Sequence, residues 1–291
     1  MTRVPDDLDA RPGSTTSLLR TIVGLYLRRL GGWIAAADFV AVMGELGVQP
    51  ASSRTAIARL KQKRLLLAER HDGVAGYRLN PDAEPMLVAG DRRIFAVTRM
   101  TAGDPWRLVS FTIPEEHRAV RHQLRRRLRG IGCGTVAQGL WICPAFLGAE
   151  VDEIIAELDV REAVTSFVTA DLAVADSLEL AVTRWWDLEA IARLHSEFVE
   201  EAEALTGGLA DGGASATGMH STSALASYVR GLDRWRPIPY VDPGLPIELL
   251  PDDWPGRRSA ELFDELSDRF AEAAWTHLRE LTSRSAVTAG D

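Results

Sequence analysis

The segment that decides the fold of the amino-terminal region is SSRTAIARLKQKR, residues 52–64. On a helical wheel of about 100° per residue, Ala56, Ile57 and Leu60 fall on one face. The opposite face carries Arg54, Thr55, Ala58, Arg59 and Gln62. The only two lysines of the 291 residues, Lys61 and Lys63, flank this polar face. The pattern predicts a helix with one side in a core and a cationic side that can enter a groove.

The flanking patterns predict a winged helix-turn-helix domain over residues 17–98. A first helix is expected after the capping candidates Thr16 and Ser17, and it ends near Leu30. The other expected elements are strands over 33–34, 65–69 and 77–79, helices over 36–46 and 84–96, a turn at 48–50, and a hairpin loop at 71–76 that contains Asp72-Gly73. The hairpin would form the wing.

A winged helix with this polar face predicts contacts to double-stranded DNA. Arginine can bind guanine edges through two hydrogen bonds, whereas lysine acts as a point charge suited to phosphate. Hydroxyl groups near a helix start can also donate to phosphates. The predicted DNA-binding residues are Ser52, Ser53, Arg54, Thr55, Arg59, Lys61, Gln62, Lys63 and, in the wing, Arg70, His71 and Arg78. A solvated charged face and a winged helix that binds protein are the alternatives.

The net charge of −8 hides a division along the chain. Residues 17–95 contain 12 basic and 7 acidic residues, and residues 96–149 contain 8 and 3. Residues 150–291 contain only 11 basic residues against 28 acidic ones. The first half can therefore face phosphates, whereas the second half would be repelled by them.

The rest of the chain predicts an α+β protein with two further domains. Strands and helices alternate as βαββαβ over residues 104–175, which is the ferredoxin-like order. Residues 176–281 read as a mostly helical effector or dimerisation domain, with a glycine-containing loop at 206–217 as its most mobile segment. Disordered tails are expected at 1–16 and 282–291.

Several motifs resemble those of the phenylacetate-catabolism repressor (PaaX) family. They are the segments 53–60 with 65–66, 106–115, 139–144, 186–188, 242–246 and 249–256. The resemblance covers about residues 17–281. The order of elements in the middle domain is also similar to that of the Cas2 nucleases. The PaaX resemblance implies a homodimeric repressor of an aromatic-acid catabolic operon that binds a palindromic operator. It also implies release by phenylacetyl-CoA or a related acyl-CoA.

Two further groups of residues are candidate ligand sites. On the helix expected over 117–129, Arg118, Arg121, His122, Arg125 and Arg129 share an arc opposite Val120, Leu124 and Leu128. This basic stripe can meet operator phosphates, the phosphates of a CoA group, or the acidic third domain, within the chain or in a dimer. Effector-binding candidates are Trp185, Trp186 and His195, although their helical spacing also fits a core role.

Two enzymatic functions are alternatives to a regulator. A Cas2-like nuclease needs an aspartate near the end of the first strand of the middle domain to hold a divalent ion, but that region reads Ser110-Phe111-Thr112. An acyl-CoA thioesterase needs a nucleophile beside a base, and Ser196 only adjoins His195 in sequence. We therefore expect no catalysis, no cofactor and no metal.

Composition also suggests where the protein acts. Cys133 and Cys143 lie in apolar surroundings without ligand-like spacing, so buried thiols are expected instead of a disulfide framework or a zinc site. No apolar run reaches the roughly 20 residues of a membrane span, and the start of the chain does not resemble a signal peptide. The expectation is a cytoplasmic, nucleoid-associated protein.

Overall fold

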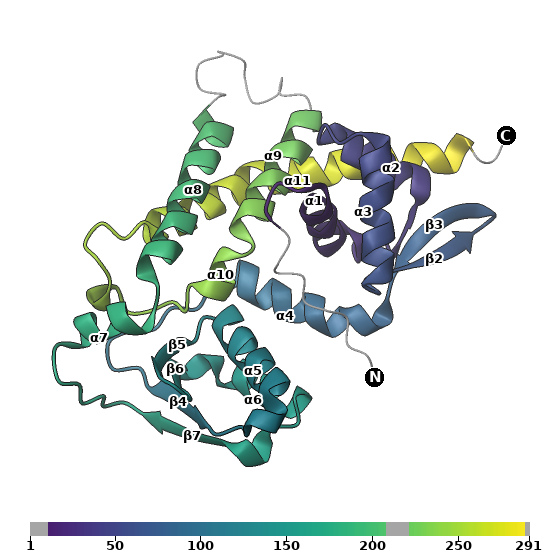
Figure 1. The fold of residues 1–291 in the computed structure, drawn as a ribbon. Coiled ribbons are helices and arrows are strands. Elements are labelled where there is room, and N and C mark those ends of the chain that lie inside the picture. Colours follow the sequence, from purple (N-terminus) through teal and green to yellow (C-terminus); the bar gives the residue numbers. More distant parts are fainter. Residues whose placement is uncertain (1–10, 208–220, 289–291) are drawn as a thin grey trace. The chain divides into compact units, whose positions relative to one another are not determined.

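The computed structural model describes residues 11–207 and 221–288, and the chain within them forms two compact units (Figure 1). The first unit contains the described parts of residues 1–92, 197–236 and 257–291. The second contains residues 93–196 and 237–256. The segment 176–281, expected as one helical domain, thus contributes to both units. No helix in the described residues is long and apolar enough to cross a membrane.

The amino-terminal part of the first unit has the elements of a winged helix-turn-helix. They are α1 Thr15–Ile22, a π-helical turn Val23–Leu27, β1 Trp33–Ala35, α2 Ala36–Glu45, α3 Pro50–Gln62, β2 Leu66–His71, β3 Val74–Leu79 and α4 Glu84–Phe95. The three strands form an antiparallel sheet in the order β1-β3-β2. Helix α3 contacts α1, α2 and β2. Gly47, with a φ of 74°, forms the tight turn between α2 and α3.

The wing is longer than the sequence pattern suggested. Asp72 and Gly73 both have positive φ angles, 48° and 82°, as a two-residue type I′ turn requires. Strands β2 and β3 therefore pair through to His71 and Val74. The expected loop over 71–76 was wrong, because the Asp-Gly pair alone reverses the chain.

Two helices begin earlier than expected. Ser14 caps α1 by accepting a hydrogen bond from the Ser17 backbone N–H, so Thr16 and Ser17 are not the caps. Residues 11–16 are therefore structured, contrary to the expected tail, while residues 1–10 lie outside the described part. Helix α3 begins at Pro50, whose fixed φ and missing N–H suit the first helical position.

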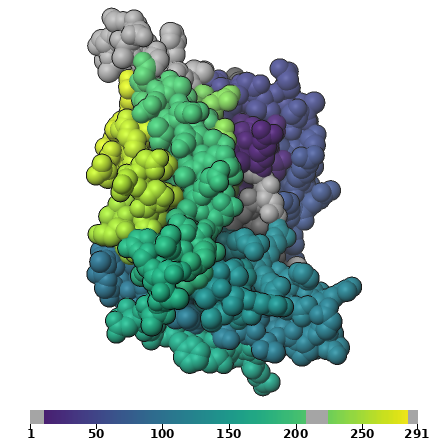
Figure 2. All heavy atoms as spheres, turned by 60° about the vertical axis from the view of Figure 1, so that its left-hand side comes forward, coloured from purple at the N-terminus to yellow at the C-terminus, as the bar shows by residue number. Residues whose placement is uncertain are grey.

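Three carboxy-terminal helices complete the first unit: the second half of α8 Leu188–Gly207, α9 Ser221–Trp235 and α11 Gly256–Thr288. Trp235 lies between Phe198 and Phe263, with ring centroids 5.3 and 4.7 Å away. Helix α8 lies beside α11 in Figure 2. An ion pair between Arg258 of α11 and Glu203 of α8 joins the two helices. Because α11 continues to Thr288, the expected tail from residue 282 was wrong over that part. The expected mobile loop lies outside the described residues from 208 onward.

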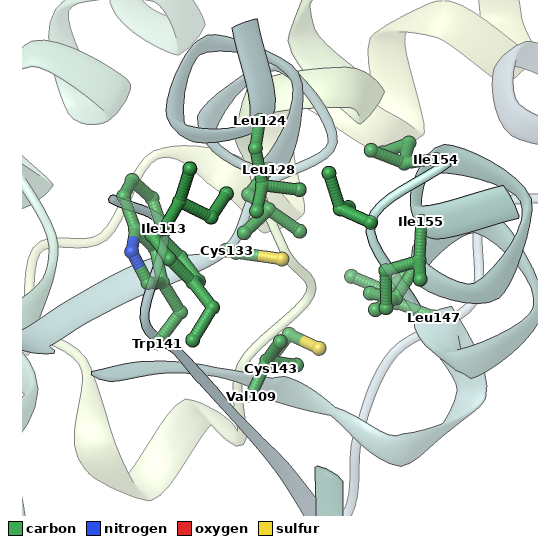
Figure 3. Close-up of a cluster of buried hydrophobic side chains, with 13 residues drawn as sticks. Val109, Ile113, Leu124, Leu128, Cys133, Trp141, Cys143, Leu147, Ile154 and Ile155 are labelled. Carbon is green, nitrogen blue, oxygen red and sulfur yellow. The ribbon is translucent and has the colours of Figure 1, made fainter. Parts of the chain in front are cut away.

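The second unit contains a ferredoxin-like domain, as the strand and helix order predicted. Its elements are β4 Trp106–Phe111, α5 Arg118–Gly130, β5 Gly134–Ala137, β6 Leu140–Pro144, α6 Gly148–Glu157 and β7 Val164–Thr169. The antiparallel sheet has the order β5-β6-β4-β7. Leu124 and Leu128 of α5 and Ile154 and Ile155 of α6 pack with strand residues in one core, on the face of the sheet that these helices cover (Figures 1 and 3).

Both cysteines belong to this core. Figure 3 shows their sulfur atoms among the side chains of the buried cluster, and both thiols are free. A hydrogen bond to Cys143, together with burial, raises the pKa of the Cys133 thiol well above its ordinary value. The prediction of buried thiols is confirmed.

A second core includes side chains from the sheet and from the carboxy-terminal motifs. Around it lie α7 Leu178–Trp185, the first half of α8, and the segment that follows α10 Ile238–Val241. Its buried members are Met100, Trp106, Ile142, Val182, Trp186, Leu188, Ile191, Leu245 and Trp254. Residues far apart in sequence thus form one apolar cluster with the ferredoxin-like domain.

Candidate nucleic-acid interface

Helix α3 divides into a buried and an exposed face as its sequence predicted. Its buried side chains are Ser53, Ala56, Ile57 and Leu60. Its exposed side chains are Pro50, Ala51, Ser52, Arg54, Thr55, Ala58, Arg59, Lys61 and Gln62. The exposed face combines cations with small and amide side chains, which is the composition needed to reach both phosphates and base edges.

Three basic side chains on α3 differ in the contacts that they make with the rest of the protein. Among the described residues, Arg54 has no hydrogen-bond or ion-pair partner. Arg59 reaches Thr16 only through a long contact of 3.4 Å between Nη1 and Oγ1. The Lys61 ammonium lies 6.0 Å from the centre of the Tyr77 ring. None of these contacts neutralises the charge, so the face is electrostatically open to an anion.

The hydroxyl groups of α3 are less available than expected. Ser53 is 0% exposed, and its hydroxyl donates to the Gln49 carbonyl at 3.2 Å. Its assignment as a DNA contact was therefore wrong, because the helical period turns residue 53 toward the core with Ala56 and Ile57. Thr55 is exposed, but its hydroxyl donates to the Ala51 carbonyl at 3.0 Å. Ser52 is exposed in the first turn.

The wing presents two of its three expected residues. Arg70 is exposed, and its Nη1 donates to the Gly73 carbonyl across the turn at 2.9 Å. The His71 side chain is 66% exposed and lies beside the Trp33 ring. Arg78 instead pairs with Glu69, 2.7 Å from Nε to the carboxylate, so its charge is already compensated.

Gly76 is a structural residue of the wing that the sequence pattern did not single out. A Cβ at this position would lie 2.4 Å from the Trp33 ring and 2.5 Å from the Ile34 carbonyl oxygen. Only glycine lets β1 pair with β3 at the Ala35–Gly76 position while Trp33 covers it. Its isolated position in an apolar strand was the available signal.

Helix α9 contacts α1 and α2 of the helix-turn-helix. Arg230 donates to the Leu46 carbonyl at the end of α2, at 2.7 Å. Asp233 accepts hydrogen bonds from the Ser17 and Thr21 hydroxyls of α1, at 2.6 and 2.8 Å. Sequence reasoning missed these residues because their partners lie more than 180 positions away in the chain.

Of the effector candidates, Trp186 and His195 are buried within the second unit. Trp186 is 6% exposed, and its indole N–H donates to the Gly132 carbonyl at 2.8 Å. His195 is 1% exposed, with Nε2 3.0 Å from Asp242 and its ring edge-on to Trp254. Trp185 is half-buried. Both buried residues thus have internal partners.

Asp242 connects His195 to a glycine turn. Burial would raise the pKa of Asp242, but hydrogen bonds from His195 and from the Gly244 N–H, with the charge of Arg99, hold that pKa below its ordinary value. Gly244 has a φ of 70°, and a Cβ there would lie 2.5 Å from the Thr98 carbonyl oxygen. The motif at 242–246 therefore orders the backbone around His195.

The two regions considered for catalysis show no assembled site. Across the described residues, no three His, Cys, Asp or Glu side chains cluster as metal ligands. Ser196 is exposed, whereas the adjacent His195 is buried against Asp242. Adjacent residues on a helix point in different directions, so the Ser196 and His195 side chains do not face each other.

Comparison with protein families gives three successive matches. Residues 14–83 match the model "PaaX-like protein", residues 99–181 match "PaaX protein central Cas2-like domain", and residues 186–280 match "PaaX-like protein C-terminal domain". Among curated proteins, the chain is 24% identical over 276 residues to "Transcriptional repressor PaaX" of Escherichia coli strain K12. That alignment covers 94% of this chain and 85% of the relative.

A solved structure supports the fold. "Uncharacterized protein Rv0674 from Mycobacterium tuberculosis" is similar with a TM-score of 0.56 and 19% identity, over 89% of this chain and 97% of that one. At this identity the likeness concerns the fold alone. The three family models follow one another along almost the whole described chain, in the order of the winged helix, the ferredoxin-like domain and the carboxy-terminal helices. The chain belongs to the PaaX family.

Proposed function

We propose that this protein is a DNA-binding transcriptional repressor whose α3 helix reads an operator. The exposed face of α3 carries the proposal: Arg54, Arg59 and Lys61 project from a helix whose other side is fixed in the core. The E. coli relative is a transcriptional repressor, which is consistent with this role. The excess of basic over acidic residues in 17–95 would favour approach to phosphates.

The proposed operator and effector follow from the family. The protein would act as a homodimer on a palindromic operator of an aromatic-acid catabolic operon, with half-sites about 34–36 Å apart or a multiple of that spacing. Phenylacetyl-CoA or a related acyl-CoA would release it. Release requires the effector to prefer a dimer geometry that does not fit the operator, since equal affinity for both geometries would shift nothing.

The test is a fluorescence-anisotropy titration of the purified protein on the DNA upstream of its own gene and on a scrambled duplex, at fixed salt. We expect specific binding at least 10³-fold tighter than binding to the scrambled duplex, as is usual for regulators. Addition of phenylacetyl-CoA is expected to abolish the difference. Equal affinity for the two duplexes would argue against operator recognition at this site.

We expect the two arginines of α3 to contact base edges and Lys61 to contact phosphates. Arg54→Ala and Arg59→Ala should each reduce discrimination between operator and scrambled duplex by about 1–3 kcal/mol, because each removes a donor able to bind a base edge. Lys61→Ala should weaken binding to both duplexes equally and lower the salt slope by about 1. The measurement is anisotropy at several salt concentrations.

Arg78→Ala is a control from the wing for these variants. The Arg78 charge is already compensated by Glu69, so its loss should leave both discrimination and the salt slope nearly unchanged. Equal losses on both duplexes for Arg54→Ala, Arg59→Ala and Lys61→Ala would contradict the division between base and phosphate contacts.

A further inference from the structure

Helix α5 of the ferredoxin-like domain carries a row of basic side chains, three arginines and one histidine. We call Arg118, His122, Arg125 and Arg129 the α5 row. At about 100° per residue they fall within an arc of about 60°, centred about 130° from the core residue Leu124. The first and last members are eleven residues apart, which is about 16 Å along the helix axis. The α5 row is therefore a straight line of basic side chains along one side of the helix.

The arginines beside the core behave differently from the α5 row. Arg121 pairs with Glu115 at 2.6 Å and also donates to the Ile113 carbonyl. Arg127 pairs with Glu157 of α6. These two residues lie about 60° to either side of Leu124, where the domain supplies acidic partners. Their role in the domain is thus explained by ion pairs.

No acidic partner accounts for the α5 row. Within residues 11–207 and 221–288, no ion pair holds Arg118, His122, Arg125 or Arg129. The Arg129 guanidinium lies 5.8 Å from the centre of the Trp141 ring, a contact that leaves its charge uncompensated. Arg118, Arg129 and His122 are exposed, and Arg125 is half-buried. Among the described residues the acidic third domain supplies no ion-pair partner to the stripe: Arg121 pairs with Glu115, which precedes α5 in the middle domain.

Helix stability does not explain the α5 row either. Arg118 is the first residue of α5, where the helix dipole disfavours a cation, and no acidic residue lies in the first turn. Arg125 and Arg129 also repel each other at a spacing of four residues. The helix dipole favours only Arg129, in the last turn, so helix stability does not account for the row as a whole.

We propose that the α5 row binds the phosphodiester backbone of double-stranded DNA, as a second contact besides α3. This inference rests on the proposed function. A duplex presents one phosphate charge per about 1.7 Å of its axis, so an extended line of cations can neutralise several charges at once. A small phosphorylated ligand would instead need side chains that converge in a hollow. The α5 row is linear and lies on a helix side, which favours the duplex. Its contacts carry no sequence information.

The test compares two double variants that remove the same charge from the same helix. Arg118→Gln/Arg125→Gln removes two members of the α5 row, whereas Arg121→Gln/Arg127→Gln removes the two paired arginines. The full-length protein is titrated on the duplex upstream of its gene and on the scrambled duplex, from 50 to 200 mM salt. Each lost phosphate contact should lower the slope of log K against log salt by about 0.9.

We expect the α5-row variant to lose about 1.8 from the slope on both duplexes, so that the fourfold rise in salt weakens it about tenfold less than wild type. The control variant should keep the wild-type slope. Arg118→Lys/Arg125→Lys should restore the slope, because lysine binds phosphate as a point charge. Discrimination between the duplexes should stay unchanged throughout, since α3 is intact.

Unchanged slopes in the α5-row variant, or equal losses in both double variants, would overturn the inference while leaving the proposed function intact. Loss of phenylacetyl-CoA binding at an unchanged slope would assign the α5 row to a phosphorylated small ligand and also overturn it. Absence of wild-type preference for the upstream duplex would count against operator recognition by α3, independently of the slope.

Discussion

Replacing Asp233 by alanine is expected to lower the free energy of unfolding by about 3–5 kcal/mol. Asp233 is 1% exposed and accepts hydrogen bonds from Ser17, Thr21 and the Gly13 N–H. The buried Arg236 guanidinium lies 3.5 Å from the same carboxylate. Alanine would take the carboxylate away from this cation and from the two hydroxyls that donate to it, and breaking a buried pair costs far more than the pair contributes.

Equilibrium urea unfolding measures this effect, with Asp264→Ala as the matched control. Asp264 is an exposed aspartate on α11, so its loss should change stability by no more than about 0.5 kcal/mol. A loss below about 1 kcal/mol for Asp233→Ala would show that water or neighbouring groups replace the carboxylate. Asp233→Asn keeps the shape of the side chain and should fall between the two.

The Asp233 network also bears on regulation. It joins α9, which belongs to the carboxy-terminal family domain, to α1 of the winged helix, and Arg230 joins the same helix to the end of α2. A ligand that shifts α9 can therefore bias the position of the helix-turn-helix without touching DNA. Operator affinity of the Asp233→Ala variant is expected to fall together with its stability.

Local patterns in the sequence were sufficient for most elements. The 3.6-residue period predicted the buried face of α3, and the alternation of strands and helices predicted the ferredoxin-like sheet. Boundaries failed where one residue decides them: Ser14 caps α1, Pro50 begins α3, and Asp72 with Gly73 closes the wing. Each of these boundaries is set by a single side chain or backbone dihedral angle, and the period of hydrophobic residues does not detect either.

Long-range contacts were beyond the same reasoning. Nothing in the period of α9 indicates that Asp233 meets Ser17, 216 residues earlier in the chain. For the same reason the sequence did not show that the carboxy-terminal helices divide between two units. At the site, the helical period gave the direction of most side chains, although Ser53 was placed on the wrong face. It gave no partners, so Arg78 was counted as available although it pairs with Glu69.

Trp186→Ala is expected to destabilise the protein by about 3–5 kcal/mol, because it empties the centre of the second core. The indole lies against Gly134, where a Cβ would be 2.6 Å from the ring, and beside Trp106. Its N–H is the hydrogen-bond donor to the Gly132 carbonyl. Trp186→Phe keeps much of the packing but leaves that carbonyl unpaired, which costs about 1–3 kcal/mol. Equilibrium denaturation measures both values.

A variant of the neighbouring Trp185 tests whether this pair of tryptophans binds the effector or serves only in the core. Trp185 is half-buried and lies edge-on to Trp186, so Trp185→Ala should cost clearly less stability than Trp186→Ala. If Trp185→Ala also loses phenylacetyl-CoA affinity while it stays folded, the ligand site includes the exposed side of this tryptophan pair. If Trp186→Ala instead keeps wild-type stability and loses only the ligand, its assignment to the core is wrong, because an indole that supports the sheet cannot be removed without that cost.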